Sequence, residues 1–284
     1  MSSDIPKKEK NDIKNFLIGS GTTPTRVILW LIAIAIVSFA IGFGILALSG
    51  VFPSSADHTN SPFKHTAWFT PTTTAFPLDG ATSANISVTM GAGELTLLGG
   101  ADKNDLMEAT VFSKASEMQP DLTQVMNNSH KTVTMTETGH KKKDWFALHS
   151  PDSWANSWEI RLTDQVPVAA DVRIGAGDCR LNLGTLNLTS LNVHAGAGDT
   201  EIDFSRYHGG RFDAAIMHGV GDLTLHVPES GNTRITVEQG VGDIAGNGFK
   251  MNNGAYITAG FNPALPVNEI AIKQGVGSVR LEMV

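Results

Sequence analysis

The segment Val193-His-Ala-Gly-Ala-Gly-Asp-Thr-Glu-Ile202 places two glycines and an acid between two runs of alternating residues. A period-two alternation of apolar and polar residues is typical of a β-strand that buries one face. Glycines are favoured where a chain turns with positive φ or where neighbouring backbones approach closely. We therefore predict a strand, a tight corner at Gly196–Gly198 and a second strand within this segment.

The same motif occurs six times along the chain. Its copies are Gly91-Ala-Gly93-Glu94, Gly175-Ala-Gly177-Asp178, Gly196-Ala-Gly198-Asp199, Gly219-Val-Gly221-Asp222, Gly240-Val-Gly242-Asp243 and Gly275-Val-Gly277-Ser278. The four central copies are spaced by 21, 23 and 21 residues, whereas gaps of 84 and 35 residues separate the first and last copies from them. A repeat of this length suits one coil of a β-solenoid, in which each unit stacks on the preceding one to bury its apolar face.

The aligned repeats predict an all-β fold class. Every copy has an apolar residue three positions before its first glycine, namely Val88, Val172, Val193, Ile216, Val237 and Ile272. We predict a single-stranded, right-handed β-solenoid over residues 75–284, with an irregular insertion at about 101–168 where the motif is lost. Strand-like pieces remain in that insertion at 107–112, 133–135 and 158–162. Cys179 falls on an inward position and is expected to be a small buried hydrophobe rather than a reactive thiol.

The N-terminal part contains an uncharged run, Val27–Leu48, of 22 residues rich in Ile, Leu, Ala and Val. A helix of this length is roughly 33 Å long, enough to cross a hydrocarbon core of about 30 Å. A cleaved signal peptide is the main alternative, but the run exceeds the about 7–15 residues typical of its hydrophobic region. We therefore predict one transmembrane helix at 27–48.

The flanks of this run predict its orientation. Residues 1–26 carry five basic and three acidic side chains, and no Lys or Arg follows the run until Lys64. The positive-inside rule places this basic tail in the cytoplasm and the remainder of the chain outside it. Residues 49–74 are rich in Pro, Ser and Thr, which favours an extended stalk. The predicted location is the plasma membrane, with the C-terminal domain extracytoplasmic.

Composition narrows the classes of partner. The net charge is −7, and because residues 1–26 carry a basic excess, the rest of the chain is acidic. An acidic body argues against a nucleic-acid partner, which requires a basic face to neutralise phosphates. The single cysteine excludes a disulfide within the chain.

Two chemical interpretations of the motif compete with a structural corner. Nucleotide-binding loops place their glycines between a strand and a helix, and no helical pattern follows any copy here. A row of Asp178, Asp199, Asp222 and Asp243 could bind calcium, but calcium-binding β-rolls repeat every nine residues or so with several ligands per turn. We expect these aspartates to accept hydrogen bonds from corner amides instead, and we predict no metal, no cofactor and no catalytic residue.

The insertion also contains a possible interaction patch of lysines and tryptophans, formed by Lys141, Lys142, Lys143, Trp145 and Trp154. Indole rings beside lysines suit an interfacial surface that meets glycans, lipid headgroups or a protein. The alternative, which we favour, is that the tryptophans, including Trp158, fill the core of an irregular subdomain.

Two stretches resemble the bacterial toast-rack domain family, an adhesin β-repeat group related to the C-terminal half of LiaF-like cell-envelope stress proteins. They are Val88-Thr-Met-Gly-Ala-Gly-Glu-Leu-Thr-Leu-Leu-Gly-Gly100 and Gly219-Val-Gly-Asp-Leu-Thr-Leu-His-Val-Pro228. The resemblance implies a surface adhesin or, in the LiaF-like branch, an inhibitor of a membrane histidine kinase. That branch usually has several membrane helices before its β-domain, whereas this chain has one predicted helix.

These observations lead to two functional hypotheses. The first is a non-enzymatic, membrane-anchored envelope protein whose exposed β-solenoid binds an unknown protein or a cell-wall component. The second is an accessory regulator that contacts an envelope-stress sensor kinase through its helix. An enzyme acting on envelope glycans is a third class, for which the sequence offers no local motif.

Overall fold

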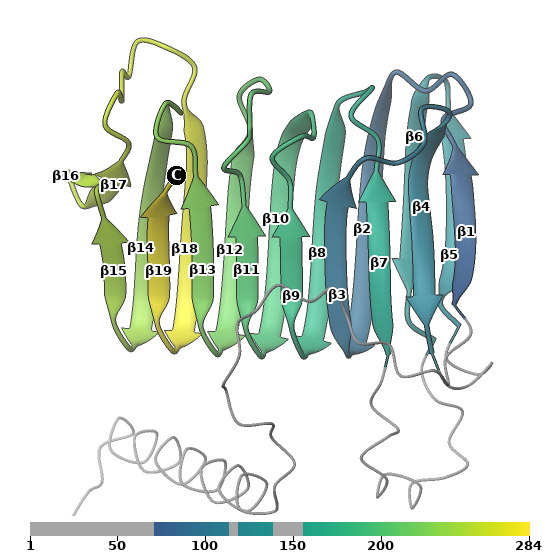
Figure 1. Cartoon of the computed structure of the whole chain (residues 1–284), viewed down its shortest axis with the longest axis horizontal. Coiled ribbons are helices and arrows are strands. Elements are labelled where there is room, and N and C mark those ends of the chain that lie inside the picture. Colours follow the sequence, from purple (N-terminus) through teal and green to yellow (C-terminus); the bar gives the residue numbers. More distant parts are fainter. Residues whose placement is uncertain (1–70, 114–118, 139–155) are drawn as a thin grey trace, which may run out of the picture. The chain divides into compact units, whose positions relative to one another are not determined.

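The computed structural model describes residues 71–113, 119–138 and 156–284, and these form nineteen strands in two sheets (Figure 1). The predicted all-β class is therefore correct for this part of the chain. Within it, no helix is long and apolar enough to cross a membrane. The predicted basic tail, the transmembrane helix at 27–48 and most of the stalk lie outside the described residues.

Each Gly-x-Gly copy joins one long strand to one short strand. The long strands are β2 (Ser83–Ala92), β8 (Val168–Ala176), β10 (Leu188–Ala197), β12 (Asp213–Val220), β14 (Thr233–Val241) and β18 (Asn268–Val276). The short strands are β3 (Glu94–Gly99), β9 (Cys179–Asn182), β11 (Thr200–Asp203), β13 (Leu223–Val227), β15 (Ile244–Asn247) and β19 (Val279–Met283). We call one long strand with its short strand a coil, and the two layers the long-strand sheet and the short-strand sheet.

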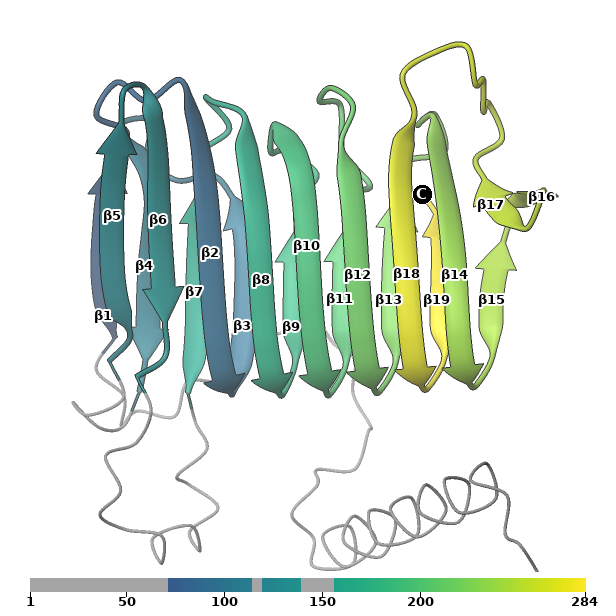
Figure 2. The same cartoon turned by 180° about the vertical axis from the view of Figure 1, so that it is seen from behind.

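Neighbouring coils pair in parallel and in register, so equivalent repeat positions form rows across both sheets. Val193, for example, pairs with Val172 of β8 on one side and with Ile216 of β12 on the other. Because side chains alternate along a strand, each apolar row faces the space between the sheets and each polar row faces solvent. Figures 1 and 2 show the two layers from opposite sides.

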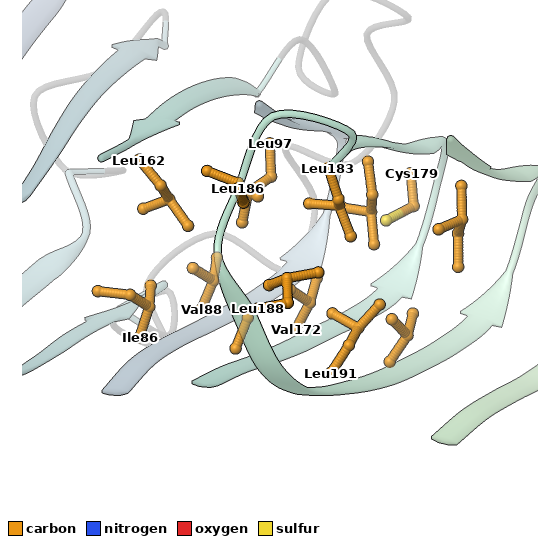
Figure 3. Packing of buried hydrophobic residues seen from close by; sticks show 14 of the residues in the cluster. Ile86, Val88, Leu97, Leu162, Val172, Cys179, Leu183, Leu186, Leu188 and Leu191 are labelled. Atoms are coloured by element: carbon orange, nitrogen blue, oxygen red, sulfur yellow. The ribbon is translucent and has the colours of Figure 1, made fainter. Parts of the chain in front are cut away.

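The core is the space between the two sheets, filled by stacked aliphatic rows (Figure 3). Val88, Val172 and Leu191 enter it from the long strands, and Leu97 and Cys179 enter it from the short strands. Cys179 is fully buried, as predicted, and burial raises the pKa of its thiol to about 12. A thiol with such a pKa stays protonated at neutral pH and is a poor nucleophile.

The N-terminal end of the stack is closed by strands without the motif. They are β1 (Thr72–Pro77), β4 (Asp105–Phe112), β5 (Asp121–Asn127), β6 (His130–Thr136) and β7 (Ser157–Leu162). Strands β6 and β7 continue the parallel stack beyond β2 and β3, and antiparallel β5, β4 and β1 then cover its edges. The strand-like pieces noted in the insertion lie in β4, β6 and β7. Trp158 of β7 is fully buried in the core.

The stalk boundary is a correction. Thr72–Thr74, which the sequence placed in the stalk, belong to β1 and pair with Ala109–Val111 of β4. The pairing buries Phe76, two residues further along the strand, against the core. Composition rich in Thr and Pro could not reveal a strand whose stabilisation comes from a partner more than thirty residues away.

The order of the last coils is a second correction, because we expected each unit to stack on the preceding one. In space the order is β12–β13, then β18–β19, then β14–β15. The final coil of the chain is therefore inserted between two coils that are consecutive in sequence (Figure 1). Beyond β14, the hairpin of β16 (Lys250–Asn252) and β17 (Ala255–Ile257) pairs with Arg234 and Ile235 only.

Candidate binding surface

The predicted corner glycines meet in two ladders along one edge of the stack. The second glycine of every motif has a φ between +120° and +141°, a conformation that residues with a Cβ rarely adopt. From the second coil of the stack onward, a Cβ on either glycine would also lie within 3.0 Å of a glycine carbonyl oxygen in the neighbouring coil. Both conditions explain why the motif tolerates no larger residue. These second glycines are Gly93, Gly177, Gly198, Gly221, Gly242 and Gly277.

The aspartates that follow the glycines connect successive coils. Asp199 accepts a hydrogen bond from the backbone N–H of Asp222 at 3.0 Å, and Asp222 accepts one from the N–H of Ser278 at 2.9 Å. Asp178 instead lies 3.5 Å from Arg180 in an exposed ion pair. Two of the four aspartates, Asp199 and Asp222, thus accept bonds from corner amides, and in both cases the amide belongs to the next coil. Among the described residues, no group of three or more His, Cys, Asp or Glu side chains could hold a metal ion.

Under the corners of the last coils lies a polar network that our sequence reasoning missed. His218 and Gln274 are 3% and 4% exposed, at a position where earlier coils carry Met90, Ile174 and Ala195. His218 Nδ1 lies 2.7 Å from Gln274 Oε1, and its Nε2 lies 2.9 Å from the carbonyl oxygen of Gly198. The amide of Gln274 donates to the carbonyl of Gly221 at 2.9 Å. The signal was available, because the residue preceding the first glycine changes from apolar to polar at the fourth copy.

At the N-terminal end of the glycine ladder, Glu137 binds the backbone amides of the first corner. Its carboxylate accepts hydrogen bonds from the backbone N–H of Gly91 and, at 3.3 Å, from that of Ala92. Asn156 donates to the other carboxylate oxygen at 3.2 Å and accepts a bond from the Trp158 indole at 2.9 Å. The first corner is therefore closed by a side chain rather than by another coil.

A groove of about 720 Å³ runs across the outer face of the long-strand sheet beside the glycine ladder. Its glycines face outward without side chains, so they leave a trough in the sheet surface. They are Gly175, Gly196, Gly219 and Gly275 of β8, β10, β12 and β18. The groove extends onto β2 through Thr89 and Met90. With strands about 4.8 Å apart, five adjacent strands give a trough roughly 19 Å long.

The exposed side chains of the lining place two basic residues, Arg173 and Lys273, along one border of the groove. Arg173, His194, Met217 and Lys273 form one row, because they are paired in register two positions before the glycines. Met217 is 45% exposed. Arg173 is paired with Asp171 at 2.7 Å, which raises the pKa of the guanidinium, and Lys273 is paired with Glu238 at 3.0 Å.

This arrangement is suited to holding an elongated ligand. The exposed Met217 side chain and the glycine backbone provide van der Waals contact, and Arg173 and Lys273 provide donors at the border. The cysteine thiol, the strongest potential nucleophile of the chain, is buried elsewhere with a pKa of about 12. The predicted patch of Lys141–Lys143, Trp145 and Trp154 lies outside the described residues.

A family model and several solved structures are similar to this chain. The family model described as the N-terminal domain of toast_rack matches residues 67–226, more than half of the chain. A crystal structure from Clostridium sporogenes, described as a "putative cell adhesion protein", is 24% identical with a TM-score of 0.69, covering 76% of this chain and 100% of its own. A crystal structure from Bacteroides fragilis, described as a "putative adhesin", is 11% identical with a TM-score of 0.28, covering 79% of this chain and 100% of its own.

A comparison with curated proteins finds no match. The Clostridium sporogenes structure, at 24% identity, supports the fold alone. The family match begins just before β1 and ends within β13, so it covers the N-terminal closure and the first four coils of the described stack. On this match the chain belongs to the toast-rack family.

Proposed function

We propose that this chain is a non-enzymatic, membrane-anchored envelope protein whose toast-rack domain binds an elongated ligand in the groove beside its glycine ladder. The groove carries this proposal, because the glycine row and the row of Arg173, His194, Met217 and Lys273 form one continuous concave surface. The ligand classes that fit are a cell-wall polymer and an extended protein segment. The description of a structural neighbour as an adhesion protein is in keeping with a binding role.

The anchoring part of the proposal rests on sequence. The 22 uncharged residues of Val27–Leu48 and the basic residues before them favour a single-pass helix with a cytoplasmic N-terminus. The coil stack would then be held outside the cytoplasm. Its solenoid would be right-handed, since crossovers between parallel strands are right-handed in nearly all proteins. Residues 49–71 would form the remaining stalk.

A charge-reversal pair of variants tests the groove. Arg173→Glu with Lys273→Glu changes two residues of the groove border. Arg180→Glu with Arg280→Glu makes the same change in charge on the exposed face of the short-strand sheet. Isolated envelope material and surface proteins are applied to vesicles that carry the full-length chain. The parent chain and the control variant should retain them, whereas the groove variant should not. Equal retention by both pairs would contradict a binding role for the groove.

Regulation of a sensor kinase through the predicted helix is the second candidate. Ser38 and Gly42 are four residues apart, a spacing that allows close packing of two membrane helices but that also occurs where small residues face lipid. Crosslinking in intact cells, with the native chain and a chain whose Val27–Leu48 is replaced by an unrelated anchor, separates the two functions. A kinase recovered only with the native helix supports regulation, whereas surface components recovered with both chains support the groove.

A further inference from the structure

The C-terminal coil, β18–β19, occupies a slot whose two walls are consecutive in the sequence. Coil β12–β13 contacts it on one side and coil β14–β15 on the other. The first glycines of these two wall coils, Gly219 and Gly240, are 21 residues apart. Gly175 and Gly196 have the same spacing, and their coils stack directly. Sequence spacing therefore does not keep the slot open; the C-terminal coil does.

The inserted coil and the coil behind it present the same groups to their neighbours. Both carry the tetrapeptide Gln-Gly-Val-Gly, at 239–242 and at 274–277. Gln274 donates to the carbonyl of Gly221 at 2.9 Å, and Gln239 donates to the carbonyl of Gly277 at 2.7 Å. Coil β14–β15 thus holds the inserted coil in the way that the inserted coil holds β12–β13. The two walls are consequently complementary to each other as well as to the coil between them.

Charged residues support the same complementarity. In the observed order, Arg234 of β14 pairs with Glu269 of β18 at 2.6 Å, and Glu269 lies in register with Asp213 of β12. If the inserted coil leaves and the walls close in register, Arg234 faces Asp213. The backbone N–H of Asp243 then faces the carboxylate of Asp222, which in the observed order accepts a bond from the N–H of Ser278. The slot can therefore empty without leaving an unpaired charge on either of these rows.

The connection to the inserted coil is suited to exchange. Residues 258–267 join β17 to β18 and include Gly260, Pro263 and Pro266. Asn232 holds this loop through bonds to the carbonyls of Asn262 at 3.0 Å and Pro266 at 2.9 Å. Ten extended residues reach roughly 33 Å, several times the spacing between coils.

We propose that β18–β19 is an exchangeable coil and that its partner is a second copy of this chain, whose identical slot accepts it. Swapping an identical element requires no new contact within the slot, so it is a low-cost route to a dimer. A swapped dimer carries two grooves on one particle. Two grooves engaging one polymer or one surface raise the overall affinity through effective concentration.

Variants of the full-length chain that each carry one added cysteine, in addition to the buried Cys179, test the exchange in mild detergent. Ala215 of β12 and Ala271 of β18 are adjacent in register and exposed, so thiols placed there are joined by a short bifunctional maleimide. Equal amounts of the Ala215→Cys and Ala271→Cys chains are mixed at high concentration, warmed below the unfolding transition, diluted and crosslinked. The proposal predicts a covalent heterodimer on a denaturing gel that increases with protein concentration.

Three controls make the result decisive. Neither single variant alone should give the band, and the parent chain should not react because Cys179 is buried. The Ala215→Cys, Ala271→Cys double variant should crosslink within one chain. A double variant that crosslinks internally while the mixture gives no heterodimer overturns the exchange. A double variant that fails to crosslink overturns the placement of β18 beside β12 on which the exchange rests.

Discussion

The two ends of the coil stack are finished differently. At the N-terminal end, antiparallel strands cover both sheets, Glu137 binds the corner amides of Gly91 and Ala92, and buried Lys131 bonds to Asp79 at 2.6 Å. At the C-terminal end, β17 covers only Arg234 and Ile235 of β14. Val241 there is 64% exposed and Ile244 is 37% exposed, although residues equivalent to Ile244 in other coils are buried.

This difference indicates which end can rearrange. Repeat stacks need their terminal units covered, because an open end exposes backbone groups and apolar surface. The N-terminal end meets this requirement through side chains that have no equivalent in the repeats. The C-terminal end meets it in part, and beside it lies the coil that is out of sequence order. We therefore expect the N-terminal end and the centre to be rigid and the inserted coil, β18–β19, to be exchangeable.

The largest expected effect is a difference in thiol reactivity between the centre of the stack and its far end, which coil β14–β15 forms. With a pKa near 12 in place of 9, the Cys179 thiol has about a thousandfold less thiolate at pH 8 than an exposed cysteine. In a Val241→Cys variant, the new thiol should react with iodoacetamide at the rate of a free peptide, while Cys179 stays unmodified until denaturant is added. Comparable rates for the two thiols, measured by mass spectrometry, would contradict a closed centre.

The same burial predicts a pH dependence of stability. Because the folded-state pKa of Cys179 is raised, its contribution is complete below pH 9, the unfolded value, and is lost as the pH rises towards 12. The free energy of unfolding, measured in urea, should therefore fall over that range. A Cys179→Ala variant should show a smaller fall, and an unchanged slope would contradict the assignment.

A glycine in the central corner should have the largest effect on stability. Gly198 has a φ of +123°, and a Cβ there would lie within 3.0 Å of backbone atoms of Gly177. Combining backbone strain with overpacking, we expect Gly198→Ala to cost about 3 kcal/mol or more. Gly210→Ala is the matched control, since no atom lies within 4 Å of its Cβ position, and it should change the urea midpoint little. Equal midpoints for the two variants would show that the corners are not tightly packed.

A pair of acid deletions compares the two ends directly. Glu137→Ala removes the acceptor for the amides of Gly91 and Ala92 and should cost about 1–3 kcal/mol. Asp243→Ala alters an exposed acid on coil β14–β15, at the other end of the stack, and should change the free energy of unfolding by less than about 0.5 kcal/mol. Similar losses for both variants, in parallel urea titrations, would remove the distinction between the ends.

The smallest expected effect is a gain in stability from a substitution in the core. Thr200 faces the core, and its hydroxyl is buried without a hydrogen-bond partner among the described residues. The equivalent residue of the inserted coil is Val279. Thr200→Val should raise the free energy of unfolding by about 1 kcal/mol, because it removes an unsatisfied polar group at nearly constant volume. Thr224→Val, on the outward face of β13, is the control, and a lower melting temperature for Thr200→Val would reveal a missed partner.

Much of this fold could be predicted from the sequence because its stabilising interactions recur at fixed positions. The corner glycines, the inward rows and the burial of Cys179 all follow from aligning six short copies. The order of the last coils could not be predicted in this way. Gly219 and Gly240 are spaced like neighbours that stack, and only the pairing of β18 with both β12 and β14 reveals the insertion.

The groove was also beyond the sequence, although its glycines were identified. Arg173, His194, Met217 and Lys273 share a repeat position but no chemical type, so no motif marks them. Their association depends on register between coils, which includes the insertion of β18. The Gln274–His218 contact likewise joins residues that are 56 positions apart.

The most direct test of this account is the order of the last three coils in the monomer. Thr236 of β14 and Ala271 of β18 are exposed and in register, whereas Ala215 of β12 lies one coil further away. With a short bifunctional maleimide, the Thr236→Cys, Ala271→Cys variant should crosslink within one chain much faster than the Thr236→Cys, Ala215→Cys variant. Faster crosslinking of the second pair would mean that β14 stacks on β12, and it would contradict both the inserted coil and the exchange derived from it.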